Sequence, residues 1–257
     1  MAPTFRHGKS SRLIVKGVDA SSMFNEMTVV SSVDTQETTT FGKDDRTFIA
    51  GQRTGTLTAQ GFLDNTTAGT NDPFKTFRDA LGSSTDLVIT AIPGAPGGST
   101  VTPGALARLG AAVETSFETA APAMGVVTAK FDAQVNDRFD FGRVLYGPAA
   151  AISSTGGKTA VDSGVAAGTT GGGVGHFHLT QSSGSVTALV IKIQHSSATV
   201  WSDLCSSTAL IATPGAKRVA VTGTVKRYTR ANVHTITGGG TKSVKIICAF
   251  ARRGPTI

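Results

Sequence analysis

The stretch that most constrains the fold is residues 29–64, which has the pattern of two strands flanking an unusually long polar crossing. Residues 55–64 alternate between apolar and polar side chains, as a strand with one buried face does. Before them, residues 34–46 show no hydrophobic period and are rich in threonine and charge. A hairpin normally turns in about two to five residues, and a longer crossing costs conformational entropy. We therefore predict a long loop over residues 34–46 that serves contacts between molecules rather than the fold of a compact monomer.

Four motifs occur in order across this stretch. They are Ser32-Val33-Asp34-Thr35, Thr38-Thr39-Thr40-Phe41-Gly42, Phe48-Ile49-Ala50-Gly51 and Gly55-Thr56-Leu57-Thr58-Ala59-Gln60-Gly61-Phe62-Leu63-Asp64. Together they resemble the tail tube (major tail) proteins of long-tailed, siphovirus-type bacteriophages. That family combines a TTTFG loop, a short step ending in glycine and a strand that runs from a glycine to an aspartate.

The resemblance implies a structural virion protein without enzymatic activity. It implies that subunits form rings, six-membered in the family, which stack head to tail into the tail tube that delivers the genome into the host. The implied partners are other copies of the chain, the tape measure protein, the tail terminator and baseplate proteins, and double-stranded DNA that passes through the lumen without specific binding. We expect no cofactor and no metal, and a place in the phage tail after synthesis in the host bacterial cytoplasm.

Charge is divided unevenly along the 257 residues, whose net charge is +7. Residues 1–150 hold 13 Lys/Arg against 15 Asp/Glu, whereas residues 151–257 hold 11 against 2. Two parts of opposite charge indicate two modules. There is no run of about eighteen apolar residues, so no membrane span or membrane insertion is predicted. Residues 1–9 lack the apolar core of a signal peptide, which predicts synthesis and use from the cytoplasm.

The first module, residues 1–147, is predicted to be mainly β with one helix. Asp72 is the predicted N-cap of that helix and Pro73 its first residue, with Phe74, Phe77 and Leu81 on one face and Gly82 at the end. The resemblance implies that this module folds as a tail-tube-type β-sandwich or barrel with one flanking helix. The predicted strands are residues 12–16, 23–31, 55–64, 85–92, 111–119, 125–135 and 139–145.

A Gly/Ser/Thr-rich segment, residues 148–172, is predicted to link this module to a C-terminal β-sandwich over residues 173–257. Regularly spaced strands without a helix predict the sandwich fold. The predicted strands are residues 174–181, 187–194, 204–211, 218–225, 228–235 and 243–251. Because this second module carries most of the positive charge, we expect it on the exterior of a tube, away from the DNA.

Three sets of residues follow as candidates for assembly and passage of DNA. A basic lining would hold the phosphates of the genome, so the lumen is expected to carry acids. The inter-ring stacking candidates are Asp34, Glu37, Phe41, Lys43, Asp44, Asp45, Arg46 and Phe48. The lumen-facing candidates are Glu26, Asp34 and Glu37, and the exterior basic surface comprises Lys217, Arg218, Lys226, Arg227 and Arg230.

Two patterns mimic phosphate or metal sites. Gly8-Lys9-Ser10 ends like a phosphate-binding loop but lacks the upstream glycine and the preceding strand, so we interpret it as part of a basic arm. His176 and His178 share a strand face, but no third ligand is near in sequence, so no metal site is predicted. Cys205 and Cys248 are the two cysteines, and Cys248 falls on an apolar strand face, which favours a buried core thiol over a disulfide.

Paired carboxylates can act as a catalytic acid and base. Glu114 and Glu118 are predicted on one strand face, with Asp132 on the polar face of the partner strand. Their neighbours imply no apolar cleft, so a solvated polar face is the favoured interpretation. No Ser-His-Asp, Cys-His or zinc pattern is visible, and no enzymatic activity is predicted.

Three alternative functions remain open. A β-sandwich module that binds a surface or a carbohydrate would need an aromatic platform, for which Trp201 and Tyr228 are the candidates. The basic residues of the second module could also bind nucleic acid, but few aromatic residues accompany them. Another tail ring protein, such as a terminator or a baseplate hub, would form closed rings that never stack.

Overall fold

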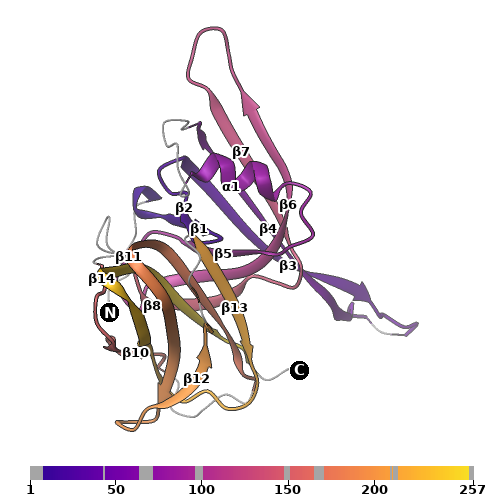
Figure 1. The fold of residues 1–257 in the computed structure, drawn as a ribbon. Helices are drawn as coiled ribbons and strands as arrows, with labels where there is room; N and C mark the ends of the chain where they lie inside the picture. Colours follow the sequence, from indigo (N-terminus) through magenta and orange to yellow (C-terminus); the bar gives the residue numbers. More distant parts are fainter. Residues whose placement is uncertain are drawn as a thin grey trace.

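The computed structural model describes residues 8–42, 44–63, 72–95, 101–147, 151–164, 171–208, 210 and 214–254. Within these ranges the chain is mainly β, as predicted, with a single α-helix, α1 (Pro73–Ala80), and a 3₁₀ turn over Gly8–Ser10 (Figure 1). All fourteen strands belong to one hydrogen-bonded sheet. They are β1 (Arg12–Val15), β2 (Val18–Asp19), β3 (Phe24–Glu37), β4 (Phe48–Phe62), β5 (Leu87–Ile92), β6 (Leu106–Ala120), β7 (Thr128–Val135), β8 (Asp140–Tyr146), β9 (Gly156–Gly157), β10 (Val161–Asp162), β11 (Gly173–Ser196), β12 (Ser202–Ser206), β13 (Gly215–Val221) and β14 (Tyr228–Arg252).

Strand β6 is shared by the branches of this sheet. On one edge it pairs with β5, where Ala112 lies opposite Leu87. On the other edge it pairs first with β8, where Leu109 lies opposite Asp140, and then with β7, where Ala112 lies opposite Val135. From β7 the sheet continues through β4 to β3, and from β8 it continues through β14 to β11. One strand therefore connects a four-stranded branch, β3-β4-β7-β6, to the C-terminal strands.

Helix α1 forms where the sequence predicts it. The Asp72 side chain accepts a hydrogen bond from the backbone N–H of Phe74, and Pro73 is the first helical residue. Phe77 is fully buried, and its ring lies 4.5 Å from the ring of Phe131 between centroids. Burial of a phenylalanine contributes about 2–3 kcal/mol to stability. Leu81, predicted on the same face, instead caps the helix and is exposed.

Two of the C-terminal strands are longer than predicted, and the described part of residues 173–257 forms fewer strands than predicted. Strand β11 is one strand where two were predicted, and β14 likewise replaces the predicted strands 228–235 and 243–251. The two pair along almost their whole length, with several register shifts. Gly184 and Gly238 lie near these shifts with φ of +72° and +151°, conformations that glycine adopts easily. The predicted strand 204–211 is shorter and begins earlier, as β12.

Hydrophobic residues form two main core clusters. One draws on residues 13–139 and includes Phe77 and Phe131, and the other draws on residues 145–250 and includes Phe177. A third, smaller cluster contains residues from both parts, such as Leu109 and Ala249. The boundaries of the two modules and of the linker stay a prediction, and residues 148–150 and 165–170 of that linker lie outside the described residues.

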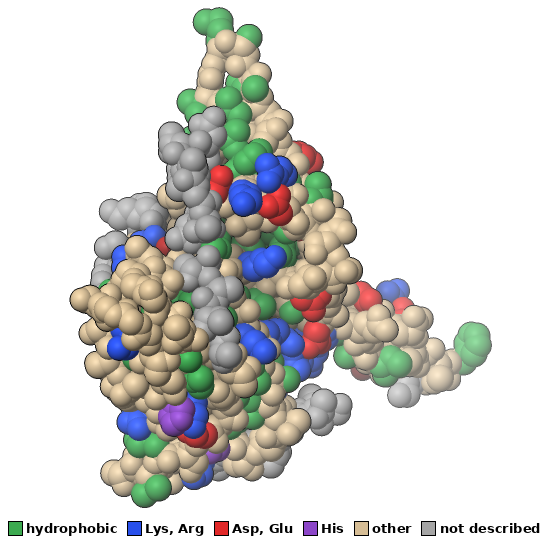
Figure 2. Space-filling model, viewed as in Figure 1, with side chains coloured by type: hydrophobic (Ala, Val, Ile, Leu, Met, Phe, Trp, Pro, Cys, Tyr) green, Lys and Arg blue, Asp and Glu red, His purple; other side chains and the backbone are tan. Residues whose placement is uncertain are grey.

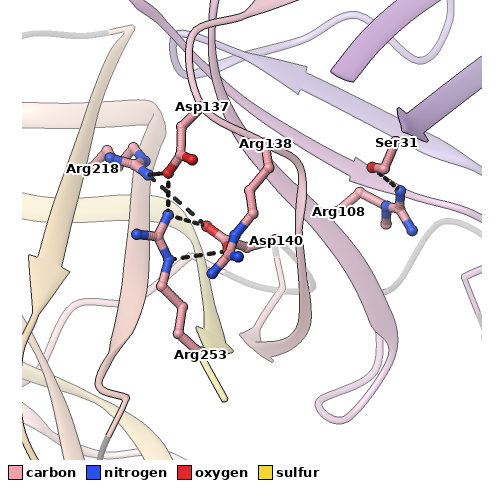
Figure 3. A network of polar contacts seen from close by, with 7 residues as sticks. All are labelled: Ser31, Arg108, Asp137, Arg138, Asp140, Arg218 and Arg253. Carbon is pink, nitrogen blue, oxygen red and sulfur yellow. Dashed lines mark hydrogen bonds and ion pairs between the residues drawn. The ribbon is translucent and has the colours of Figure 1, made fainter. Parts of the chain in front are cut away.

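A network of charged side chains joins the start of β8 to the C-terminal strands (Figure 3). The carboxylate of Asp140 is almost fully buried and lies 2.8 Å from Nη2 of Arg253 and 2.9 Å from Nε of Arg138. Asp137 also pairs with Arg253 at 2.7 Å, and Arg218 of β13 lies 3.9 Å from both carboxylates. These ion pairs hold the end of the chain against the first module. No helix in the described ranges has the length and apolarity needed to cross a membrane.

Candidate assembly surfaces

The predicted polar loop over residues 34–46 is mostly a paired hairpin arm. Strands β3 and β4 stay in register out to Glu37 opposite Phe48, so only residues 38–47 form the turn. The loop prediction is wrong over residues 34–37, because both faces of this arm meet solvent and no hydrophobic alternation marks the strands. Figure 1 shows the arm projecting from the body of the molecule.

The tip of this arm presents an exposed aromatic ring. Phe41 has a relative exposure of 109 %. The turn around it is hydrogen-bonded: the N–H of Thr38 donates to the carbonyl of Thr47 at 2.7 Å, and the hydroxyl of Thr39 donates to Glu37 at 2.8 Å. Of the other predicted stacking residues, Asp34, Asp44, Asp45, Arg46 and Phe48 are exposed, and Lys43 lies outside the described residues.

Arg108 anchors the base of the arm. Its Nη2 donates to the hydroxyl of Ser31 on β3 at 2.6 Å (Figure 3), and its guanidinium lies 3.6 Å from the centroid of the Phe141 ring. Burial lowers the pKa of Arg108. The guanidinium thus links β3, at the base of the arm, to β8.

The four-stranded branch has one covered face and one open face. Helix α1 and the first core cluster lie against the covered face through Leu57, Phe77 and Phe131. The open face carries exposed or half-buried side chains, which are mostly polar. Residues that pair across all four strands form three rows on this face, which we call rungs. They are Glu26–Gln60–Lys130–Glu118, Thr28–Thr58–Asp132–Ser116 and Val30–Thr56–Gln134–Val113.

The open face bears more acids than bases. Its acids are Glu26, Glu118 and Asp132, and its base is Lys130, which lies 2.9 Å from Asp132. Burial raises the pKa of Asp132, but hydrogen bonds from Thr58, Lys130 and its other partners outweigh that effect and lower the pKa. Asp132 is therefore ionised at neutral pH, and Lys130 is already neutralised by it.

Two of the three predicted lumen residues lie farther out along the arm. Asp34 is at the register shift between Val33 and Thr35. Strand alternation puts Glu37 on the side of Val33, opposite to Glu26. The sheet therefore brings Glu26 to the open face and separates Glu37 from it.

A bulge in β6 separates the predicted carboxylate pair. The register shifts between Glu114 and Ser116, so Glu114 turns to the covered face while Glu118 stays on the open face opposite Lys130. The prediction that Glu114 and Glu118 share a face is wrong for this reason. Glu114 is only 3 % exposed, neither carboxylate oxygen has a hydrogen-bond partner among the described residues, and burial raises its pKa to about 8.

The turn between β6 and β7 is an apolar tip that the sequence analysis missed. Residues 120–127 carry no polar side chain, and Met124 and Val126 are 96 % and 63 % exposed. Figure 2 shows hydrophobic side chains at the ends of both projecting hairpins. The signal was present as an apolar run where a hairpin turn is normally polar.

The predicted basic surface consists largely of residues with partners inside the chain. Arg227 pairs with Asp162 at 2.7 Å, and Arg218 belongs to the network around Asp140. The guanidinium of Arg230 lies 4.1 Å from the centroid of the Trp201 ring. The other two residues, Lys217 and Lys226, lie on β13 and before β14. These contacts leave less free positive charge than the sequence count indicates.

The two candidate platform aromatics each carry an arginine. Besides Arg230 over Trp201, the guanidinium of Arg227 lies 5.2 Å from the centroid of the Tyr228 ring. A sugar that stacked on either ring would have to use the opposite face or displace the arginine. No observation among the described residues favours a carbohydrate site here.

The two histidines of β11 lie together, as predicted, and are fully buried. Thr90 of β5 bridges them, with its hydroxyl 3.1 Å from Nδ1 of His176 and 2.8 Å from Nε2 of His178. Burial lowers the pKa of both, to about 3 for His178. Among the described residues no group of three possible metal ligands occurs. Cys205 and Cys248 are free thiols, and burial raises the pKa of both.

No protein-family model and no curated protein matches this chain. Among solved structures, a chain of the virion of a native gene transfer agent particle is 14 % identical, covers 53 % of this chain and 98 % of its own length, with a TM-score of 0.42. A chain of the SPP1 tail tube is 15 % identical, covers 52 % and 78 %, with a TM-score of 0.41. The SPP1 Dit protein, described as a hub adsorption apparatus, is 15 % identical, covers 94 % and 98 %, with a TM-score of 0.34. The structural neighbours of this chain thus include phage tail tube and hub proteins.

Proposed function

We propose that this chain is a structural virion protein that assembles into stacked rings and forms the tail tube of a siphovirus-type phage. The observation that carries the proposal is the branch β3-β4-β7-β6, which has one face packed on the core and one polar face uncovered. Of the tail-tube motifs, residues 32–35 lie on β3, residues 38–42 in the turn that follows, and residues 48–51 and 55–62 on β4.

Ring closure follows from the free edges of that branch. Among the described residues, β3 pairs only with β4, and residues 113–120 of β6 pair only with β7. Unpaired strand edges promote aggregation unless another strand covers them. In a ring, the β3 edge of one copy joins the β6 edge of the next, and the branches close into one large barrel with no free edge. We propose six copies for each ring.

The open face then lines the lumen. Its rungs are rich in hydroxyl and amide groups, and three acids face one lysine that is already paired. Phosphates therefore meet no free cation on these rungs and are repelled weakly, so double-stranded DNA passes without being held. Glu26 is the predicted lumen residue that the rungs support, and Asp34 and Glu37 remain candidates on the arm.

The β3–β4 tip supplies the contact between rings. It stands clear of the body and carries Phe41 among the charged residues Asp44, Asp45 and Arg46. We place the C-terminal module with its basic residues on the tube exterior, joined to the branch through β8, which pairs with β6 on one side and with β14 on the other. The tape measure protein, the terminator and the baseplate are the proposed partners at the lumen and at the two ends of the tube.

Negative-stain electron microscopy of the purified protein over a range of concentrations tests this proposal. The fifteen residues of β4 span roughly 50 Å at ~3.3 Å per residue. A tilt of about 35–45°, typical of barrels, reduces this to roughly 35–40 Å along the axis, which is the smallest axial ring repeat expected because the turns at both ends of β4 add to it. The expected result is hollow tubes with a striation of at least that spacing. A matched variant in which a two-residue turn replaces residues 38–47 should form rings without tubes.

Two other results would redirect the proposal. Closed rings that never stack, from the unmodified chain, would identify another tail ring protein such as a terminator or hub. Monomers at every concentration would contradict self-assembly and favour a surface-binding module.

A further inference from the structure

We propose that the β3–β4 tip of one copy packs against the β6–β7 tip of the next copy along the tube, with Phe41 against Met124 and Val126. This inference rests on the proposed function and names the surface that receives the stacking contact. It assigns a role to residues 120–127, which the motifs of residues 32–64 do not include.

Strand pairing puts the two tips at opposite ends of the four-stranded branch. Strand β4 begins at Phe48, next to the β3–β4 turn, and ends at Phe62. Phe62 lies opposite Thr128, the first residue of β7, so the β6–β7 turn lies just beyond that end. A ring built from this branch therefore carries β3–β4 tips on one rim and β6–β7 tips on the other. When rings stack head to tail, these two rims face each other.

The two tips are also chemically matched. Phe41 is fully exposed at one, and Met124 and Val126 are the exposed apolar side chains of the other. A thioether adapts to an aromatic ring and makes favourable contacts at the ring edge. Exposed apolar groups that protrude from a structure usually mark an interaction site. Because residues 120–127 carry no charge, Asp44, Asp45 and Arg46 meet no like charge there and stay at the rim of the contact.

A second copy of the chain is the occupant that the geometry favours. Within one molecule the tips cannot meet, since a full strand length separates them. A contact between two different patches of identical subunits is heterologous, and it propagates without closing when the subunits are related by translation along an axis. Both halves of the contact are present on every copy, which is the requirement for an open stack.

Disulfide trapping tests the contact directly. The variant carries Phe41→Cys and Met124→Cys, both at exposed turn positions where the fold does not depend on the side chain. Under mild oxidant, axial neighbours should link into a ladder of multimers on non-reducing gels, and reductant should collapse it. The single variants and the native chain, in which Cys248 is buried and Cys205 is partly buried, serve as controls. A matched pair, Phe41→Cys with Val200→Cys, places the second thiol at an exposed position between β11 and β12 and should give no ladder.

The gel and the microscope answer separate questions. A ladder specific to the Phe41/Met124 pair supports the contact. The absence of that ladder overturns the inference, and tubes seen by microscopy in the same sample would leave the proposed function standing. A sample that forms neither a ladder nor rings would contradict both the contact and the proposed function. As a second readout, Val126→Asp should convert tubes to rings, whereas Val200→Asp, at an exposed valine between β11 and β12, should leave tube length unchanged.

Discussion

Replacing Glu114 by glutamine tests the effect of the bulge in β6 on stability. Glu114 is buried on the covered face with no partner for its carboxylate oxygens among the described residues, and its pKa is raised to about 8 from an ordinary 4.5. In the unfolded chain the group ionises at its ordinary pKa. The folded state therefore holds a proton that the unfolded state releases, over the whole interval between the two values.

The sign and the size of the effect follow from that interval. A raised carboxyl pKa leaves stability intact below about pH 4.5 and lowers it as the pH rises toward 8. Each pH unit within the interval changes the free energy of unfolding by about 1.4 kcal/mol. Between pH 5 and pH 8 the native chain should thus lose about 3–4 kcal/mol from this group alone. Glu114→Gln, which cannot ionise, should not lose it.

Denaturant unfolding of the monomer at several pH values measures this difference. The difference between native chain and variant isolates Glu114, because other titrating groups contribute equally to both. Glu118→Gln is the matched control, since Glu118 is exposed on the open face of the same strand. Parallel pH profiles for the native chain and Glu114→Gln would refute the argument and show that Glu114 finds a partner or water in solution.

Three further predictions concern groups that hold the C-terminal strands. Asp140→Asn should lower the free energy of unfolding by about 2 kcal/mol. This loss is smaller than for a fully buried ion pair because the arginine partners of Asp140 are partly exposed. An unchanged free energy of unfolding in denaturant would show that the network does not contribute to stability. The lowered pKa of His178 means that stability is present above about pH 6.5 and falls with acidification, by about 2 kcal/mol at pH 5. His178→Gln should flatten that acid slope in calorimetry, and an identical slope would contradict it. A thiol reagent at pH 8 should label Cys248 and Cys205 slowly in the folded chain and fully after denaturation, because burial keeps both as thiols; rapid labelling of the folded chain would argue against their burial.

Local signals in the sequence predicted the elements that have one buried face. The N-cap of α1 and the alternation of residues 55–64 and 125–135 are such signals, and each lies in the element expected. The arm of β3 and β4 was missed as a strand pair because solvent meets both of its faces. The bulge at Glu114 leaves no local mark, since its position depends on how β7 pairs with β6. The contact of Thr90 with His176 joins residues far apart in the chain and depends on the tertiary fold.

The junction between the two parts of the chain is made by main-chain hydrogen bonds as well as by the covalent connection. Strand β8 pairs with β6 on one side and with β14 on the other, and Asp140 seals the junction against Arg253. A truncation after residue 147 would therefore strip a strand from β8 and open the cluster around Leu109 and Ala249 to water. In the proposed tube, this junction would repeat the C-terminal strands at fixed intervals in a fixed orientation. If the C-terminal module lies outside that tube as proposed, a protein fused to the C-terminus would be displayed as a regular helical lattice.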